Sequence, residues 1–251
     1  MERPRLLTCG AFWAPSVSEP ASSDCCQASA SAGTTSESPA QGLRFVRERC
    51  APLGLAATAL HQAILRAFAG TGGPPALPEL QATAAAFDRP ATPILADLHD
   101  CDVIRLDHAG DVIVAYPFSA TPTRHLVRLA DGTRVFAMCA IDALGIPAML
   151  DTDAVITATD PTGDHTITIE IVGGRAAWNP AAAVVFVGVE SGGGPSADCC
   201  CNYLNVFPDR PTAQSWADAH PRISGQILDP SDAERLGTDI FGTLLHPAPA
   251  A

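Results

Sequence analysis

The sequence predicts an α+β protein in which an N-terminal winged-helix-like three-helix module precedes a mixed or antiparallel β-sheet core with flanking helices. Two observations carry this prediction. Apolar residues recur at helical spacing in three segments between residues 53 and 102, whereas the chain after residue 120 alternates apolar and polar residues between Gly, Pro and Asp turns. Runs of helices followed by runs of strands are typical of the α+β class.

The first 42 residues differ in composition from the rest of the chain. They are rich in Ser, Ala and Pro and offer little that could form a core, so residues 1–42 are expected to be a disordered tail. The tail carries Cys9, Cys25 and Cys26, and a cysteine pair in such a tail is able to capture a soft metal.

Residues 43–120 predict a winged helix-turn-helix-like domain. Its helical segments are LAATALHQAILRAFAG, PALPELQATAAAF and PATPILADLHDCD, and the hairpin that follows them is VIRLDHAGDVIVAYPF. The third helix would enter a DNA groove, yet it contains three aspartates and no lysine or arginine. A winged-helix metalloregulator is therefore the least favoured function, and a structural module or lid is the alternative.

Residues 121–246 predict the β-sheet domain. The segment AVITATDPTGDHTITIEIVGG indicates a hairpin, and AAAVVFVGVE indicates a buried strand. PTAQSWADAHP and PSDAERLGTDIFGTLL predict helices, because each opens with a proline beside Thr or Ser. CAIDALGIPAML predicts a short apolar helix that stops near Gly145-Ile146-Pro147.

Charge and cysteine content restrict the function classes. The formal net charge is −12 and all 15 basic residues are scattered arginines, so no nucleic-acid partner is expected. There is no signal-peptide core and no run of about 18 apolar residues, so no membrane partner and a cytoplasmic location are expected. Nine cysteines, three of them consecutive, favour thiol chemistry or soft-metal binding over a disulfide framework.

The stretch VFAMCAIDALGI, residues 135–146, places Cys139 and Asp142 three positions apart in an apolar run. On a helix such residues share one face, with Cβ atoms about 5–6 Å apart, so both side chains could address one bound atom. Burial would raise the pKa of the Asp142 carboxyl and let it hold or relay a proton near neutral pH. The alternative is a core thiol beside a helix-terminal charge or cap.

The stretch DCCCNYLNVF, residues 198–207, supplies the adjacent cysteines Cys199, Cys200 and Cys201 before a predicted alternating strand. Neighbouring side chains along a strand point in different directions, so one or two of the three are expected to face a pocket. Thiolates select soft metals, and two cysteines with one acid would bind such a metal and donate a proton beside it. A surface thiol cluster without a catalytic role is the alternative.

Two segments together, VFAMCAIDALGIPAML and CNYLNVFPDRPTAQSWADAHP, resemble the alkylmercury (organomercurial) lyase family. That family carries a C-A-[LI]-D-x-L segment, a second cysteine further along the chain, and P-T-A-x-x-W on a helix. The resemblance covers residues 53–245. It implies that residues 121–246 form an alkylmercury lyase-like catalytic domain.

The resemblance implies roles for individual residues. Cys139 and Cys201 would be the thiolates that bind the mercury of the substrate, and Asp142 would be the catalytic proton donor. Cys200 is the reserve choice for the second thiolate. The implied reaction is protonolysis of the carbon–mercury bond of an organomercurial, which gives a hydrocarbon and Hg(II).

The resemblance also implies the partners. Small thiols or a mercuric reductase would accept the Hg(II), and no organic cofactor would be needed. The alternative function is a non-catalytic soft-metal (mercury) binding or sequestration protein, which would hold the metal without turnover.

Overall fold

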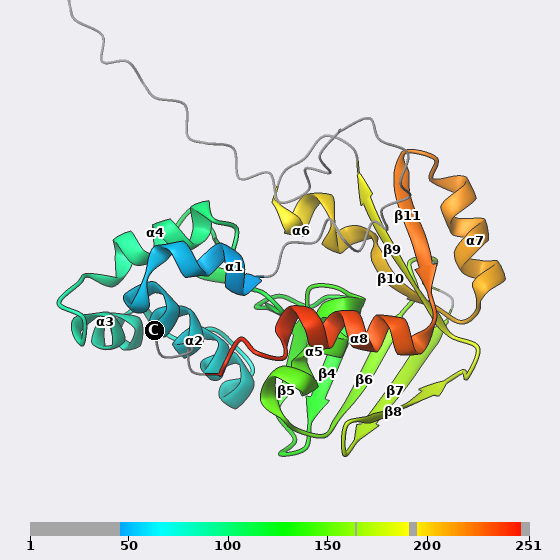
Figure 1. The fold of residues 1–251 in the computed structure, drawn as a ribbon, viewed down its shortest axis with the longest axis horizontal. Coiled ribbons are helices and arrows are strands. Elements are labelled where there is room, and N and C mark those ends of the chain that lie inside the picture. Colours follow the sequence, from blue (N-terminus) through cyan, green and yellow to red (C-terminus); the bar gives the residue numbers. More distant parts are fainter. Residues whose placement is uncertain (1–45, 164, 191–194, 247–251) are drawn as a thin grey trace, which may run out of the picture.

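The N-terminal helices gather on one side of the molecule, and most of the strands lie with the later helices on the other side, in the computed structural model, which describes residues 46–163, 165–190 and 195–246 (Figure 1). The helical side contains α1 (Val46–Cys50), the 3-10 helix η2 (Ala51–Leu53), α2 (Leu55–Thr71), α3 (Leu77–Ala85) and α4 (Ala91–Asp100). Helix α2 buries Leu60, Ile64 and Phe68 on one face, as the apolar spacing predicts. Its C-cap is Gly72, which has a left-handed φ of 83° and whose N–H donates to the Phe68 carbonyl.

An eight-stranded sheet forms the centre of the strand-rich side. Its strands are β1 (Ile104–Leu106), β2 (Val112–Ala115), β3 (Phe118–Ser119), β4 (His125–Leu129), β5 (Arg134–Ala137), β6 (Ala154–Thr159), β7 (Thr166–Val172) and β8 (Arg175–Asn179). Their order is β1-β2-β3-β5-β4-β6-β7-β8, and every neighbouring pair is antiparallel. In β7, Ile167, Ile169 and Ile171 alternate with more exposed residues, so this strand has one core-facing side.

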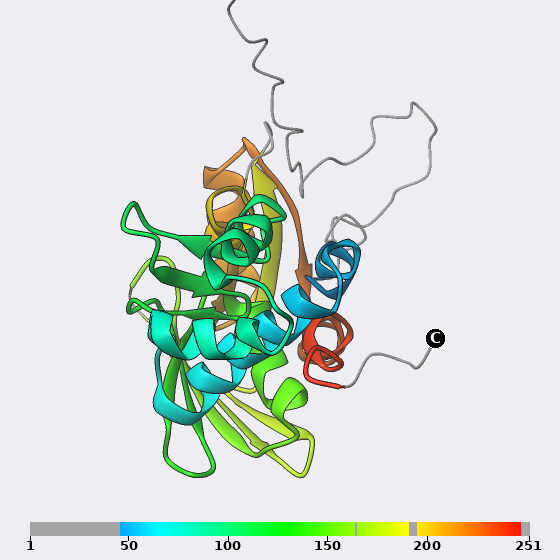
Figure 2. The same ribbon diagram turned by 90° about the vertical axis from the view of Figure 1, so that its left-hand side faces the viewer.

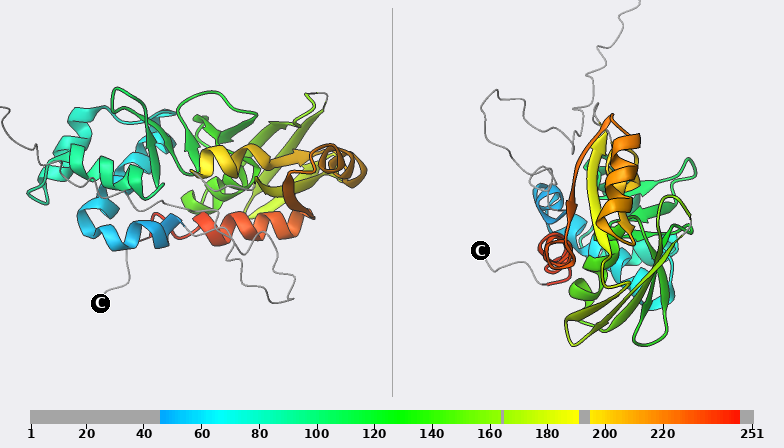
Figure 3. Two further views of the ribbon diagram at one scale, coloured as in Figure 1. Left: turned by 90° about the horizontal axis from the view of Figure 1, so that it is seen from above. Right: turned by 90° about the vertical axis from the view of Figure 1, so that its right-hand side faces the viewer.

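Helix α5 (Ala140–Leu150) lies between the larger sheet and helix α8 (Pro230–Phe241). Figure 2 shows α8 end-on and outside the layer of strands, and the left view in Figure 3 shows it running along the molecule. The predicted stop of α5 near Gly145-Ile146-Pro147 is wrong, because the helix continues to Leu150. Pro147 removes one backbone donor, but burial of α5 on both sides outweighs that local cost.

A second sheet of three strands contains β9 (Val184–Glu190), β10 (Leu204–Phe207) and β11 (Ile223–Leu228), in the antiparallel order β10-β9-β11. Both of its faces are covered. Val184 and Phe186 pack with residues of helix α7 (Arg210–Ala219), whereas Val185 and Val187 belong to the main core. Figure 3 shows α7 on the outer side of this sheet.

The cysteine triplet lies in helical turns rather than in a strand. Cys199 ends the short helix α6 (Ser196–Cys199), and Cys201 begins the 3-10 helix η3 (Cys201–Tyr203). The strand after them starts at Leu204, and all four of its residues are buried, so the expected alternation is wrong. The reason is that β10 is covered on both faces.

The α+β class and the antiparallel sheet agree with the sequence prediction. The three N-terminal helices and the hairpin β1–β2 lie in the expected segments, and their winged-helix arrangement stays a prediction. The hairpin is continuous with the larger sheet, because β2 pairs with β3 and β3 with β5. The expected tail 1–42, with Cys9, Cys25 and Cys26, lies outside the described residues. Among the described helices, none is long and apolar enough to span a membrane.

Replacing Gly145 with Ala tests the contact between α5 and α8. A Cβ at this position would lie 2.3 Å from Cδ2 of Phe241 and 2.9 Å from the Gly237 carbonyl oxygen. We therefore expect Gly145→Ala to lower the free energy of unfolding by about 1–3 kcal/mol in urea denaturation, as overpacked cores do.

Gly70→Ala is the matched control, because Gly70 is exposed near the end of α2 and a Cβ there meets no atom within 4 Å. This control should raise stability by up to about 1 kcal/mol. Equal stability of the Gly145→Ala protein and the wild type would contradict the close packing.

Candidate functional site

The start of α5 carries two of the candidate residues. Cys139 lies two residues after the end of β5 and is the N-cap of α5, with extended backbone at φ −150°. Its sulfur accepts a hydrogen bond from the Asp142 backbone N–H at 3.4 Å, in the place that a Ser, Thr or Asp oxygen usually occupies. This cap fixes Asp142 in the first helical turn, next to the Cys139 sulfur.

Cys201 reaches the same place from a distant part of the chain. Its thiol donates to Oδ2 of Asp142 at 3.8 Å. The ligand atoms of Cys139, Asp142 and Cys201 all lie within 4.8 Å of one another, which makes these three a group able to hold a metal ion. The structure therefore brings together three of the four residues that the sequence singled out.

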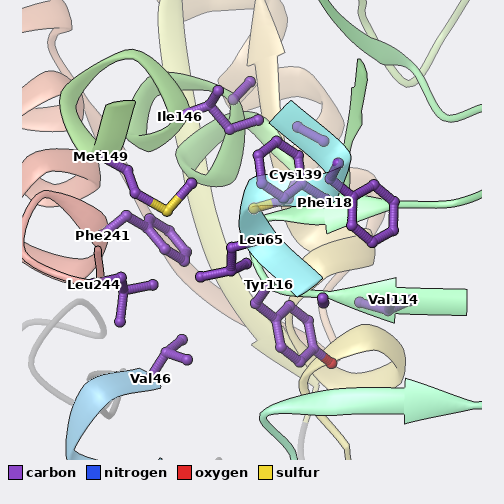
Figure 4. Close-up of a cluster of buried hydrophobic side chains, with 14 of the residues drawn as sticks. Val46, Leu65, Val114, Tyr116, Phe118, Cys139, Ile146, Met149, Phe241 and Leu244 are labelled. Atoms are coloured by element: carbon purple, nitrogen blue, oxygen red, sulfur yellow. The ribbon is translucent and has the colours of Figure 1, made fainter. Parts of the chain in front are cut away.

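All three side chains are buried: Cys139 is 2% exposed, Asp142 3% and Cys201 8%. Figure 4 shows Cys139 within a cluster of buried apolar side chains that includes Leu65 and Phe118. Burial in such surroundings strengthens every electrostatic interaction at the site, because little water is present to screen it.

Burial also changes the ionisation of Asp142. It raises the pKa of this carboxyl to about 7, against opposing effects of the hydrogen bond with Cys139 and the positive charge of Arg49. A carboxyl with this pKa is partly protonated at neutral pH, so Asp142 is able to donate a proton there.

The two thiols hold their protons more tightly than ordinary cysteines. Burial, followed by the hydrogen bond with Cys201 and the charge of Asp142, raises the pKa of Cys139 well above its usual value. For Cys201, the hydrogen bond with Cys139 lowers the pKa, but burial and the Asp142 charge outweigh it and the net pKa is raised. A metal that binds these sulfurs must therefore displace protons.

A cavity of about 50 Å³ opens onto the three residues. Its apolar walls come from Val46, Ile141, Leu204, Ile240 and Phe241. Its polar lining, besides Cys139, Asp142 and Cys201, consists of Arg49, Tyr116, Ser196 and Cys200. The space is large enough for a small apolar group but not for a bulky cofactor.

Cys200, the reserve choice for the second thiolate, also lines the cavity but does not belong to the group of three. Its sulfur lies 3.5 Å from the Cys199 sulfur. Of the three adjacent cysteines, Cys201 is the one whose sulfur groups with the ligand atoms of Cys139 and Asp142 within the described part of the chain.

Sequence reasoning missed Arg49, Tyr116 and Ser196 as cavity residues. They come from α1, the turn between β2 and β3, and α6, which are far apart in the sequence. None of them belongs to a spaced motif, and only the folded chain brings them to the cavity. No pattern in the sequence could have identified them.

Comparison with known proteins decides the family. The family model MerB, alkylmercury lyase, matches residues 118–242, which include β3, the site residues and all of α8. The chain belongs to the alkylmercury lyase family. It is therefore an enzyme, and the Cys and Asp residues that meet in the cavity lie inside the matched segment.

Curated relatives in this family align with more than half of this chain. The alkylmercury lyase of Staphylococcus epidermidis is 27% identical over 155 residues, which cover 61% of this chain and 70% of the relative. The alkylmercury lyase of Bacillus cereus is 27% identical over 165 residues, with coverages of 62% and 69%. A solved structure described as the mercury-bound form of MerB2 shares the fold at a TM-score of 0.67 and 20% identity, covering 80% of this chain and 97% of that one.

The raised pKa of Asp142 predicts a pH dependence of stability. The folded-state pKa of about 7 exceeds the ordinary value of 3.8, so the folded chain binds this proton more tightly than the unfolded chain. The stabilisation that the Asp142 carboxyl contributes to the fold is fully present below pH 3.8 and is lost as pH rises through 7. Asp142→Asn removes this pH dependence, because an amide does not titrate.

We expect the variant to gain stability over the wild type by up to about 1.4 kcal/mol per pH unit across that window. The gain should level off at higher pH. Urea unfolding of both proteins at several pH values measures the difference, and a difference that does not change with pH would refute the buried-carboxyl explanation.

Proposed function

We propose that this chain cleaves the carbon–mercury bond of organomercurials by protonolysis, with Cys139 and Cys201 as the mercury-binding thiolates and Asp142 as the proton donor. One observation carries the proposal. Two thiols and a carboxyl that is partly protonated at neutral pH lie within 4.8 Å of one another in a buried cavity. Membership of the alkylmercury lyase family supports the reaction class.

The two sulfurs suit the substrate. Mercury is a soft metal and prefers thiolate sulfur to oxygen or nitrogen ligands. An organomercurial carried by a small thiol exchanges that thiol for Cys139, so the small thiol leaves with the Cys139 proton. Cys201 then binds the same mercury and passes its proton to Asp142, toward whose Oδ2 its thiol already points at 3.8 Å.

Asp142 completes the reaction. With two thiolates on the mercury, electron density shifts to the bound carbon. The Asp142 proton moves to that carbon while the carbon–mercury bond breaks, and its electron pair forms the new carbon–hydrogen bond. The hydrocarbon leaves, Hg(II) stays on the two sulfurs, and Asp142 is left as a carboxylate. The apolar walls of the cavity accept the organic group.

Release of Hg(II) needs an external acceptor. We propose that small thiols or a mercuric reductase take the metal from Cys139 and Cys201, and that no organic cofactor takes part. Two incoming thiols bind the Hg(II) and return their protons to the two cysteines. Asp142 is already the carboxylate that accepts the next proton from Cys201, so the starting state is restored. The cavity, at about 50 Å³, leaves little room for a larger acceptor to enter fully.

The activity is tested with purified protein, methylmercury and excess thiol, by measuring methane in the headspace. Cys139→Ser and Cys201→Ser should each abolish methane release, because a hydroxyl is a poor ligand for mercury. Asp142→Asn should lower the rate by about 10²–10⁴-fold, the usual contribution of a general acid.

Cys101→Ser is the matched control, because Cys101 is a partly exposed thiol that does not line the cavity. This variant should keep the wild-type rate. Wild-type protein that binds Hg(II) stoichiometrically without releasing methane would instead identify a sequestration protein. Full methane release by the Cys139→Ser protein would overturn the assignment of the thiolates.

A further inference from the structure

Asp102 is a buried carboxylate outside the cavity that contacts several cavity residues. It lies just after α4, is 1% exposed and has a left-handed φ of 52°. Its Oδ2 accepts hydrogen bonds from Nη1 of Arg49 at 2.6 Å and from the hydroxyl and backbone N–H of Ser196 at 2.6 and 3.0 Å. Its Oδ1 accepts a hydrogen bond from the Tyr116 hydroxyl at 3.1 Å.

These contacts join three separate parts of the fold. Arg49 belongs to α1, Tyr116 follows β2, and Ser196 is the first residue of α6. Two further bonds strengthen the junction: Nη1 of Arg49 donates to the Ser196 hydroxyl at 3.2 Å, and the Ala197 N–H donates to the Tyr116 hydroxyl at 2.9 Å. The first two N–H groups of α6 are thus held at this junction: that of Ser196 by Asp102 and that of Ala197 by the Tyr116 hydroxyl.

The junction coincides with the cavity wall. Arg49, Tyr116 and Ser196 line the cavity, and all three are hydrogen-bonded to Asp102, which is not itself a lining residue. The helix that begins at Ser196 leads within five residues to Cys201. The position of Cys201 opposite Cys139 therefore depends on where α6 is held.

We propose that Asp102 is a positioning residue, which holds α6 and Arg49 against the cavity and so keeps Cys201 in reach of Cys139 and Asp142. The expected effect of Asp102 on turnover rests on the proposed function. Its expected effect on the position of Cys201 does not. The four donors to Asp102 compensate the burial of its charge, since hydrogen bonds to an ionised acceptor are the strong ones.

A role of Asp102 in stability alone predicts a different outcome for activity than a role in positioning α6. Removing one member of a buried ion pair destabilises a protein strongly, whereas replacing both members by neutral groups is often harmless. Asp102→Asn alone should therefore lower the melting temperature, and the double variant Arg49→Met/Asp102→Asn should restore most of it. If Asp102 serves only stability, activity returns with the melting temperature. If it positions α6, activity does not return.

The experiment measures two properties of the double variant besides its melting temperature. The first is the rate at which N-ethylmaleimide alkylates Cys201, followed by peptide mass spectrometry on the full-length protein without mercury. The second is kcat/KM for methylmercury. Release of α6 should speed alkylation of Cys201 and lower kcat/KM, each by about tenfold or more, because small misplacements of a reacting group have effects of this size.

Two additional variants make the test decisive. Ser196→Ala removes one hydroxyl from the junction and leaves the ion pair, so it should fold and shift Cys201 alkylation in the same direction by a smaller factor. Arg210→Met/Asp229→Asn removes an exposed ion pair of the same 2.6 Å length and should change neither property.

The proposal would be overturned if Cys201 were alkylated at the wild-type rate in both the Arg49→Met/Asp102→Asn and the Ser196→Ala proteins. Recovery of the wild-type kcat/KM in the Arg49→Met/Asp102→Asn protein would also overturn it. Absence of methane from the wild type would refute the proposed function alone. The alkylation rates do not depend on turnover and would still decide the role of Asp102.

Discussion

The burial of the Asp142 carboxyl between two thiols is the constraint on which the rest of the structure depends. A charged carboxylate is unstable in such surroundings, so burial raises its pKa to about 7 and the group keeps a proton that an exposed aspartate would lose. The same burial keeps the Cys139 and Cys201 sulfurs protonated until a soft metal displaces their protons. Exclusion of water therefore has two effects at once: it keeps a proton on Asp142, and it keeps the Cys139 and Cys201 sulfurs protonated until a metal binds.

The fold supplies this burial through close packing around α5. The helix is covered by the larger sheet on one side and by α8 on another, and Gly145 permits the ring of Phe241 to approach its backbone. The N-cap at Cys139 places two reactive groups at the covered end of the helix. The third group, Cys201, comes from η3 just before the second sheet's strand β10, so the site lies where the two sheets and the N-terminal helices meet.

Local parts of this arrangement could be predicted from the sequence, and long-range parts could not. The spacing of Cys139 and Asp142 predicted a shared helix face, because helix geometry relates nearby positions. Cys201 could be paired with them only through the family resemblance. Pro147 and the triplet gave wrong local predictions, because tertiary burial extended α5 and because Cys199 and Cys201 occupy helical turns. The contacts of Asp102 join distant segments and leave no periodic pattern.

The cavity walls have a consequence for the order of events during synthesis. Val46 comes from the first described helix, and Ile240 and Phe241 come from the last, yet they line one space. The pocket cannot close while α8 is still inside the ribosome, even though Cys139 and Asp142 have already emerged. Until then, the thiols of the growing chain lack their apolar cover and stay open to any reagent in the surrounding solution.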